Sequence, residues 1–239
     1  MTELTETAAH ATDARTVLAG LRPQVFGDGN PGRVLDPIVE PLWSGIRALA
    51  AVDEGEVTLA DESGDPIAGH DEIRAALADA ALAGHVVIDG VLTKLAARDG
   101  SGVYVGMDDM PSTSQLASRS LLGIRRNRAE EVTQAMNAAR AARTFGPDDT
   151  VTFVAIDLLW LDGESLLDVP FLERRRLLES AVNESDLVRR SVFVRPPFES
   201  WVGSWHALGF AGLSYKAANS RYRPGVATKD WVSAPMPRR

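Results

Sequence analysis

The segment Val151-Thr-Phe-Val-Ala-Ile-Asp-Leu-Leu-Trp-Leu161, followed by Asp162-Gly163, carries the clearest structural signal in the chain. It is a nearly unbroken apolar run of strand length, which is typical of a strand buried on both faces. Residues 171–182 then predict an amphipathic helix with its leucines inward and Arg174, Arg175 and Arg176 largely on a solvated face. The sequence therefore places a buried strand before a packed helix.

Shorter elements are predicted on both sides of this pair. Residues 37–43, 46–52 and 57–60 favour an antiparallel meander, and residues 71–83 favour a helix. Further strands are expected at 85–97, 103–107, 191–194, 212–217 and 230–234, and further helices at 128–144 and 201–208. Arg223-Pro-Gly225 predicts a turn.

These strands and helices do not alternate regularly, so we expect an α+β fold. Residues 1–33 are polar and Ala-rich and end in Gly27-Asp-Gly-Asn-Pro-Gly32, which favours an N-terminal helical extension and a loop. Residues 34–239 are then expected to form one domain. No repeat or linker interrupts them.

The composition narrows the function. The chain has no cysteine and four scattered histidines, so a zinc or other metal site is not expected. A net charge of −8 argues against general nucleic-acid binding, which needs a cationic face. The sequence lacks an apolar run of membrane-spanning length and a signal peptide, so we expect a cytoplasmic protein without a membrane partner.

Ordered blocks across residues 36–235 carry a family resemblance. They are Glu40-Pro-Leu-Trp-Ser-Gly-Ile-Arg47, Asp61-Glu-Ser-Gly64, Val87-Ile-Asp-Gly-Val-Leu92, Ala155-Ile-Asp-Leu-Leu-Trp-Leu-Asp-Gly163, Ala211-Gly-Leu-Ser-Tyr-Lys216, and Tyr222-Arg-Pro-Gly225 with Trp231-Val-Ser-Ala-Pro235. In this order and spacing they resemble the nucleotidyltransferase, or adenylation, domain of ATP-dependent DNA ligases. The resemblance implies two antiparallel sheets flanked by helices around a central groove.

The chain departs from the family pattern at the positions that carry charge. Leu42 stands where ligases have the nucleophilic lysine, and Ser44 stands at an aspartate. Five more charges of the family are replaced at Glu62 (an arginine), Val91 and Ala211 (glutamates), and Ser233 and Pro235 (lysines). Ile156 replaces an aromatic residue that stacks on adenine, whereas Glu40, Arg47 and Lys216 match. The family's second, OB-fold domain is not expected, because the sequence stops at Arg239.

The resemblance implies a reaction that these residues do not support. In ligases the lysine amine attacks the α-phosphate of ATP, with magnesium and cationic side chains stabilising the transferred group. Leu42 has no nucleophilic atom, and the sequence has only three lysines, at 94, 216 and 229. We therefore expect no catalytic residue and no cofactor, although active relatives use ATP and Mg²⁺.

Three functions remain open. The first is a pseudoenzyme that serves as a binding or scaffolding module through a protein partner or self-association, with a possible link to DNA repair and with weak or absent DNA binding. The second is a small-ligand-binding protein. The third is residual nucleotidyltransferase activity with an unusual nucleophile. Lys216 and Arg47 are read either as phosphate-binding relics or as solvated or salt-bridged side chains, and Asp157 either as a metal ligand or as a residue that caps or fixes the backbone.

Overall fold

The computed structural model describes residues 13–94, 145 and 149–237. The described strands are β1 (Val25–Gly27), β2 (Pro37–Pro41), β3 (Ile46–Asp53), β4 (Glu56–Ala60), β5 (His85–Thr93), β6 (Thr152–Leu161), β7 (Glu164–Ser165), β8 (Val188–Arg190), β9 (Gly212–Ala217) and β10 (Ala227–Pro235). The helices are α1 (Ala14–Gly20), α2 (Asp71–Ala80), α5 (Phe171–Ala181) and α6 (Glu199–Ala207), with a short 3₁₀ turn, η1 (Pro31–Arg33). The predicted segments 103–107 and 128–144 lie outside the described residues.

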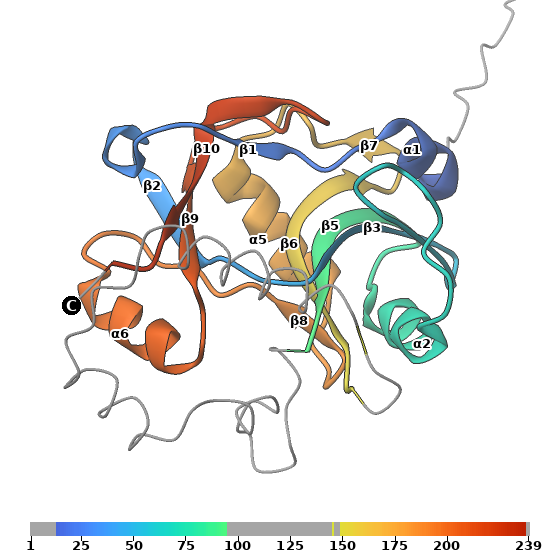
Figure 1. The fold of residues 1–239 in the computed structure, drawn as a ribbon. Coiled ribbons are helices and arrows are strands. Elements are labelled where there is room, and N and C mark those ends of the chain that lie inside the picture. Colours follow the sequence, from blue (N-terminus) through green and yellow to red (C-terminus); the bar gives the residue numbers. More distant parts are fainter. Residues whose placement is uncertain (1–12, 95–144, 146–148, 238–239) are drawn as a thin grey trace, which may run out of the picture.

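The strands form two sheets, which confirms the α+β class (Figure 1). The first sheet has the order β1-β10-β9-β2, and the second has the order β4-β3-β5-β6-β7 with β8 also paired to β6. Most neighbours are antiparallel, but the β1–β10 and β6–β8 pairs are parallel. The two sheets face each other across the centre of the molecule, and the helices lie around them (Figure 1).

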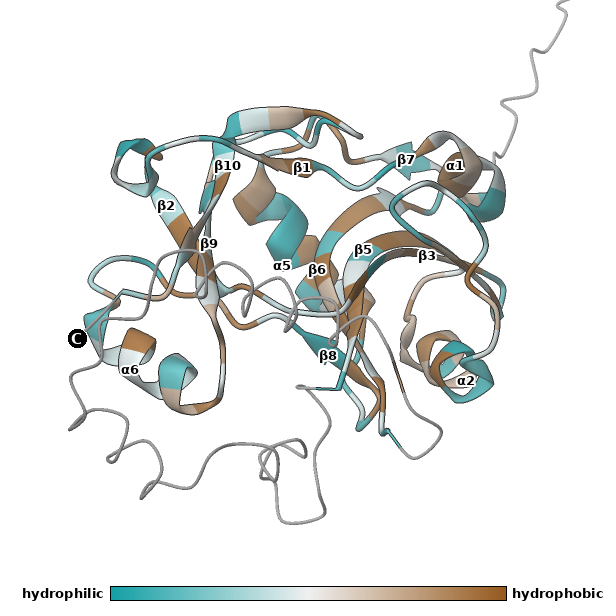
Figure 2. Ribbon diagram, in the orientation of Figure 1, coloured by the Kyte–Doolittle hydropathy of each residue, from teal (hydrophilic) through white to brown (hydrophobic). Residues whose placement is uncertain are grey.

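The quoted segment forms the strand that the sequence predicts. The first eight residues of β6 are all buried, and its neighbours are β5 on one side and β7 and β8 on the other. Brown, apolar residues dominate β3 and β6 in Figure 2. The predicted helices at 71–83 and 201–208 correspond to α2 and α6, and the predicted strand at 212–217 is β9. None of the helices in the described part of the chain is long and apolar enough to cross a membrane.

Four of the sequence predictions were wrong. The run at 37–43 does not continue the meander: β2 pairs with β9 in the first sheet, while β3 and β4 pair in the second. The strand expected at 191–194 is β8, which ends at Arg190. Residues 25–27, predicted as loop, form β1 beside β10. The fourth error concerns the arginines of α5.

Two of the three consecutive arginines of α5 are core residues rather than surface residues. Arg174 is 0% exposed and Arg175 is 1% exposed, whereas Arg176 is exposed and pairs with Glu173 at 2.7 Å. Arg174 donates to both carboxylate oxygens of Asp157, through Nε at 2.9 Å and Nη2 at 2.7 Å. Helical periodicity predicts which face of α5 is buried. It cannot predict that a buried carboxylate of β6, Asp157, pairs with an arginine on that face.

Asp157 also fixes its own backbone, as one of the two readings of the sequence expects. Its Oδ1 accepts the N–H of Leu158 at 2.9 Å. Asp157 is the register partner of Asp89 on β5, and both carboxylates are fully buried. Two neighbouring buried carboxylates need opposite charges, and each has one: Arg174 for Asp157 and Arg47 for Asp89.

Candidate functional site

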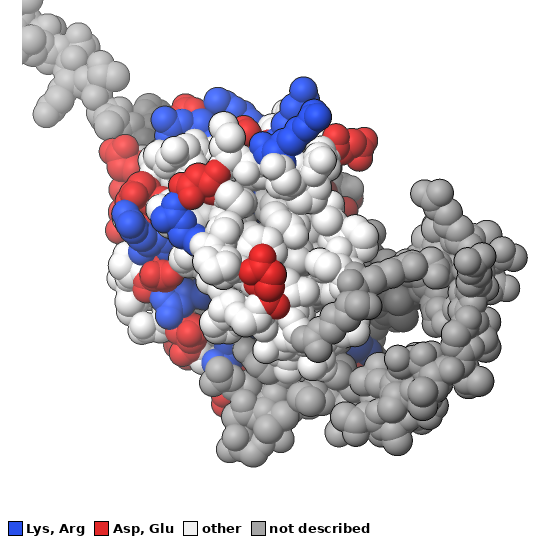
Figure 3. Space-filling view, turned by 90° about the vertical axis from the view of Figure 1, so that its left-hand side faces the viewer, with Lys and Arg blue, Asp and Glu red and all other residues white. Residues whose placement is uncertain are grey.

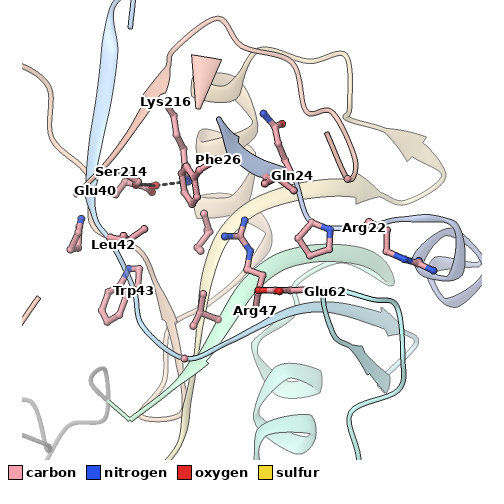
Figure 4. Close-up of a pocket in the computed structure, with 17 residues that line it drawn as sticks. Arg22, Gln24, Phe26, Glu40, Leu42, Trp43, Arg47, Glu62, Ser214 and Lys216 are labelled. Carbon is pink, nitrogen blue, oxygen red and sulfur yellow. Dashed lines mark hydrogen bonds and ion pairs between the residues drawn. The ribbon is translucent and has the colours of Figure 1, made fainter. Parts of the chain in front are cut away.

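A cavity of about 550 Å³ lies between the two sheets. Its walls come from the segment before and within β1, from β2 and the loop after it, and from β3, β5, β6 and β9 (Figure 4). The lining residues are Arg22, Pro23, Gln24, Val25, Phe26, Glu40, Pro41, Leu42, Trp43, Gly45, Arg47, Glu62, Val91, Ile156, Ser214, Lys216 and Gly225. This volume is in the range of pockets that hold small ligands and cofactors.

The structure brings together seven of the eleven positions that the sequence singles out. Those that line the cavity are Glu40, Leu42, Arg47, Glu62, Val91, Ile156 and Lys216. Ser44 lies in the loop between β2 and β3, outside the lining, and Ala211 is exposed at the start of β9, where its carbonyl accepts the N–H of Met236 at 2.9 Å. These two positions do not face the cavity.

Ser233 and Pro235 also lie outside the lining, but on the relevant face of the first sheet. Ser233 is opposite Ser214 and Pro235 is opposite Gly212 across the β10–β9 pair. Because side chains alternate along a strand, both belong to the same face as Ser214 and Lys216. Both are exposed. Lysines at these two positions would therefore reach toward the mouth of the cavity, and serine and proline do not.

Lys216 and Glu40 form a buried ion pair at one end of the cavity. Lys216 Nζ lies 2.5 Å from Glu40 Oε2, and the two side chains are 1% and 2% exposed (Figure 4). The ammonium also lies 4.3 Å from the ring centre of Trp231 and 4.8 Å from that of Phe171. Burial lowers the pKa of Lys216, and the carboxylate of Glu40 opposes that shift. Lys216 is thus a paired residue and not a solvated one.

Arg47 is held by a second buried carboxylate. Its Nε and Nη2 each donate to Asp89 at 2.6 Å, and Asp89 is also the acceptor for the hydroxyl of Tyr222 at 2.8 Å. Burial would lower the pKa of Arg47, but the charge of Asp89 outweighs it and raises this pKa. Burial, followed by the charge of Asp89, raises the pKa of Tyr222 well above its usual value. The guanidinium therefore enters the cavity already neutralised by a fixed carboxylate.

Three apolar side chains occupy positions where the ligase pattern has a nucleophilic lysine, a glutamate and an aromatic residue. Leu42, Val91 and Ile156 come from the end of β2, from β5 and from β6, and all three line the cavity. Val91 and Ile156 are 4% and 5% exposed, and Leu42 is half-buried. Gly45 keeps the loop after Leu42 tight, since its φ is +153° and a Cβ there would lie 2.0 Å from the carbonyl oxygen of Leu92. The first motif keeps Gly45 and the charged Glu40 and Arg47, while Leu42 replaces its lysine and Ser44 its aspartate.

Sequence reasoning missed several residues of the cavity. Arg22, Gln24 and Phe26 come from a stretch that the sequence assigns to an extension and a loop, and the three-residue β1 gives no alternating pattern that would have revealed them. Gln24 is anchored by donating from Nε2 to Thr228 Oγ1 at 3.1 Å. Trp43 also lines the cavity, and its Nε1 donates to Ser191 Oγ at 3.0 Å.

The described residues contain no cluster of three or more His, Asp or Glu side chains placed to hold a metal ion. Glu62 is the remaining carboxylate on the cavity wall, and it stands where the family has an arginine. Hard cations such as Mg²⁺ bind through several oxygens, commonly one or two carboxylates with water and substrate phosphates. Among the described residues, the cavity wall has two carboxylates. Glu40 is paired with Lys216, and Glu62 is exposed.

The fold and the site define an adenylation-type domain, and comparison with known proteins gives its family. A sequence model described as "ATP dependent DNA ligase domain" matches residues 34–233. This match covers most of the chain. The chain belongs to the ATP-dependent DNA ligase domain family.

The similar proteins include LigD proteins of mycobacteria. The "Multifunctional non-homologous end joining DNA repair protein LigD" of Mycobacterium tuberculosis (strain ATCC 25618 / H37Rv) is 32% identical over 194 residues, which are 81% of this chain and 21% of LigD. The solved ligase domain of M. tuberculosis LigD gives a TM-score of 0.60 at 27% identity, covering 91% of this chain and 60% of that one. The structure titled "mycobacterial DNA ligase D complexed with ATP and MES" gives a TM-score of 0.59 at 28% sequence identity. That match covers 90% of this chain and 60% of the other. The chain spans about a fifth of curated LigD.

Proposed function

We propose that this chain is a pseudoenzyme: a ligase-type adenylation fold that does not form an AMP adduct and acts as a binding or scaffolding module for a protein partner or a second copy of itself. The observation that carries the proposal is Leu42 in the cavity wall, in the place of the nucleophile. The similarity to LigD, whose name describes end joining and DNA repair, supports a role connected with repair.

The other lysines support the loss of the nucleophile. Lys94 pairs with Asp149 at 3.7 Å, and Lys229 is exposed on β10; neither lines the cavity. Lys216 does line it, but its amine is buried against Glu40 and between two aromatic rings. An attacking amine must be unprotonated and free to approach phosphorus. Burial lowers the pKa of Lys216, but the contact with Glu40 and the two rings hold its amine in place, which opposes the use of Lys216 as a substitute nucleophile.

The charges on the cavity wall argue against ATP and Mg²⁺ as cofactors. Its cations are Arg22, Arg47 and Lys216, of which the last two face Asp89 and Glu40 at ion-pair distance. Glu62 adds a negative charge at the mouth. A triphosphate needs an excess of cations that are free to contact it. With its main cations already neutralised, the cavity favours uncharged over polyanionic ligands.

Several arginines that could contribute to a basic face are already paired with carboxylates. Arg190 pairs with Glu184 and Arg195 with Asp36, and Arg189 is buried and pairs with Asp186. On the face shown in Figure 3, blue and red side chains are interspersed along the edge and the middle is almost free of charge. Duplex DNA is bound by releasing counterions with a continuous set of cations. We propose that DNA binding is weak and that protein contacts dominate.

A second candidate function is the binding of a small molecule, and the cavity itself favours it. About 550 Å³ lined by Leu42, Val91, Ile156 and Phe26 is a mainly apolar space with a few convergent polar groups. That combination characterises ligand sites. The two functions are compatible, because a ligand in the cavity would stabilise the module that binds the partner.

A nick-sealing assay with the wild-type chain and with Leu42→Lys tests the pseudoenzyme proposal. We expect neither to seal a nicked duplex in ATP and Mg²⁺, because the variant regains the nucleophile but not the cations at 233 and 235 or the carboxylate at 91. Each such preorganised contact is worth about 2.7–4 kcal/mol. A ligase of the family serves as the positive control. Sealing by the wild-type chain would refute the proposal, and sealing by Leu42→Lys alone would show that one residue causes the loss.

A further inference from the structure

The end of the cavity holds two polar groups whose hydrogen-bonding capacity the protein leaves unfilled. Glu40 Oε1 has no hydrogen-bond partner among the described residues, and the ammonium of Lys216, which pairs with Glu40 Oε2 at 2.5 Å, has further N–H groups to donate. Both atoms are closed off from water. Buried polar atoms are nearly always satisfied in native proteins, and exceptions often mark a group with a functional partner. Here an acceptor and a donor lie side by side.

Apolar side chains form much of the wall beside this pair, together with the polar Ser214 and Arg47. Leu42, Val91 and Ile156 replace a lysine, a glutamate and an aromatic residue of the family pattern, and Phe26 and Trp43 are half-buried on the same cavity. A ligand that reaches Glu40 and Lys216 would therefore place the rest of its surface against hydrocarbon and aromatic rings. Such walls favour an apolar or aromatic body.

The charge balance excludes a strongly charged guest. A carboxylate ligand would approach Glu40, which already lies beside Lys216, and an ammonium ligand would approach Lys216. Arg47 is held in two hydrogen bonds by Asp89. Bringing a third charge to a buried ion pair adds a desolvation cost and a like-charge repulsion. A neutral group that both donates and accepts a hydrogen bond satisfies the pair without either cost.

We propose that this cavity binds a compact, uncharged apolar or aromatic molecule that carries an amide, with the amide N–H donating to Glu40 Oε1 and the amide oxygen accepting from Lys216 Nζ. The two protein atoms are reached after small side-chain rotations, which are common on binding. This inference rests on the proposed loss of adenylation, because a nucleotide-binding cavity would be occupied by ATP instead.

Calorimetric titration with three one-ring probes tests this specificity. Benzamide is the uncharged amide, and benzoate and benzylammonium present the same ring with a negative and a positive group. We expect benzamide to bind with a Kd of roughly 0.1–1 mM, typical of an efficient fragment of its size, and at least about tenfold more tightly than either ion. Equal or tighter binding of an ion, or no saturation by benzamide, would overturn the inference. Adenosine binding tenfold tighter than benzamide would also overturn it, in favour of a retained nucleoside site.

Two variants with the same added charge locate the site. Leu42→Lys places an ammonium on the half-buried cavity wall, and Leu82→Lys places one at an exposed position after α2, outside the lining. We expect the first to weaken benzamide binding about tenfold and the second to leave it unchanged. Leu42→Gln, which adds no charge, should weaken binding less and serves if the lysine variant does not fold. Unchanged binding in both Leu42 variants would place the amide elsewhere.

Failure of this inference is distinguishable from failure of the proposed function. Nick sealing by the same preparation would overturn the pseudoenzyme proposal whatever the probes do. Absence of both sealing and amide binding would remove the ligand class and leave the pseudoenzyme proposal standing.

Discussion

Replacing Arg174 with methionine removes the cation that neutralises Asp157, the buried carboxylate of β6. Arg174 and Asp157 are both 0% exposed and share two hydrogen bonds, at 2.9 and 2.7 Å. Arg174 Nη1 also donates to the carbonyl of Ser220 at 3.2 Å, which ties α5 to the segment between β9 and β10. Methionine fills a similar volume but has no donor. Asp157 is then left with the N–H of Leu158 alone.

The expected loss follows from the burial of the pair. Removing one partner of a buried ion pair costs about 3–5 kcal/mol, because the remaining charge must stay buried unpaired or take up a proton. Domains of this kind have a free energy of unfolding of about 5–15 kcal/mol. The change therefore consumes at least a fifth of the stability and in a marginal domain most of it.

Urea unfolding followed by circular dichroism measures this loss, and the same helix supplies the control. Arg176 is one residue away from the buried arginines and pairs with Glu173 at 2.7 Å, but both are exposed. Arg176→Met should cost about 0–0.5 kcal/mol. If Arg174→Met lowers the free energy of unfolding by less than 1 kcal/mol more than Arg176→Met does, the assignment of Arg174 and Asp157 as the structural pair of this fold is wrong.

Three further predictions concern pH, ATP and DNA. The hydrogen bond that protonated His85 donates from Nδ1 to Asp53 Oδ1, at 3.0 Å, raises the pKa of His85. His85 therefore stabilises the fold below its unfolded pKa of about 6.5 and loses that contribution as pH rises through the folded pKa. The difference in free energy of unfolding between wild type and His85→Gln should shrink from pH 5.5 to 8.5, and a constant difference would refute this prediction. Millimolar ATP should not raise the melting temperature, because ligand binding stabilises only when its concentration exceeds Kd; a rise with ATP but not with inorganic triphosphate would show that adenine recognition persists. Nicked duplex DNA should give no anisotropy change below roughly 10⁻⁴ M at physiological salt, and micromolar binding that falls steeply with salt would reveal a basic face.

The strands and helices that carry a strong local pattern were predictable. β6 is a long apolar run, and α2 and β9 combine clear periodicity with turn residues at their ends. The pairing of strands was not predictable in the same way. The residue pattern of segment 37–41 does not differ from that of a strand in a meander. Only the tertiary structure shows that this segment pairs with β9.

Several residues of the site could be predicted from the family motifs. The ion pairs among them could not. Seven of the positions marked by family motifs line one cavity. The ion pairs Arg47–Asp89 and Lys216–Glu40, however, join residues far apart in the chain, and a sequence gives no local signal for either. The solvated face expected for Arg174 and Arg175 was wrong for the same reason, because their acceptors lie on β6 and near Ser191.

The central claim is that the cavity forms no covalent bond with AMP, because Leu42 occupies the place of the nucleophile and the amine of Lys216 is committed to Glu40. Intact-mass spectrometry of the pure chain after incubation with ATP and Mg²⁺ tests this claim directly. We predict an unchanged protein mass. A mass gain equal to one AMP would contradict this prediction. If that gain disappeared in Lys216→Arg, Lys216 would be the nucleophile.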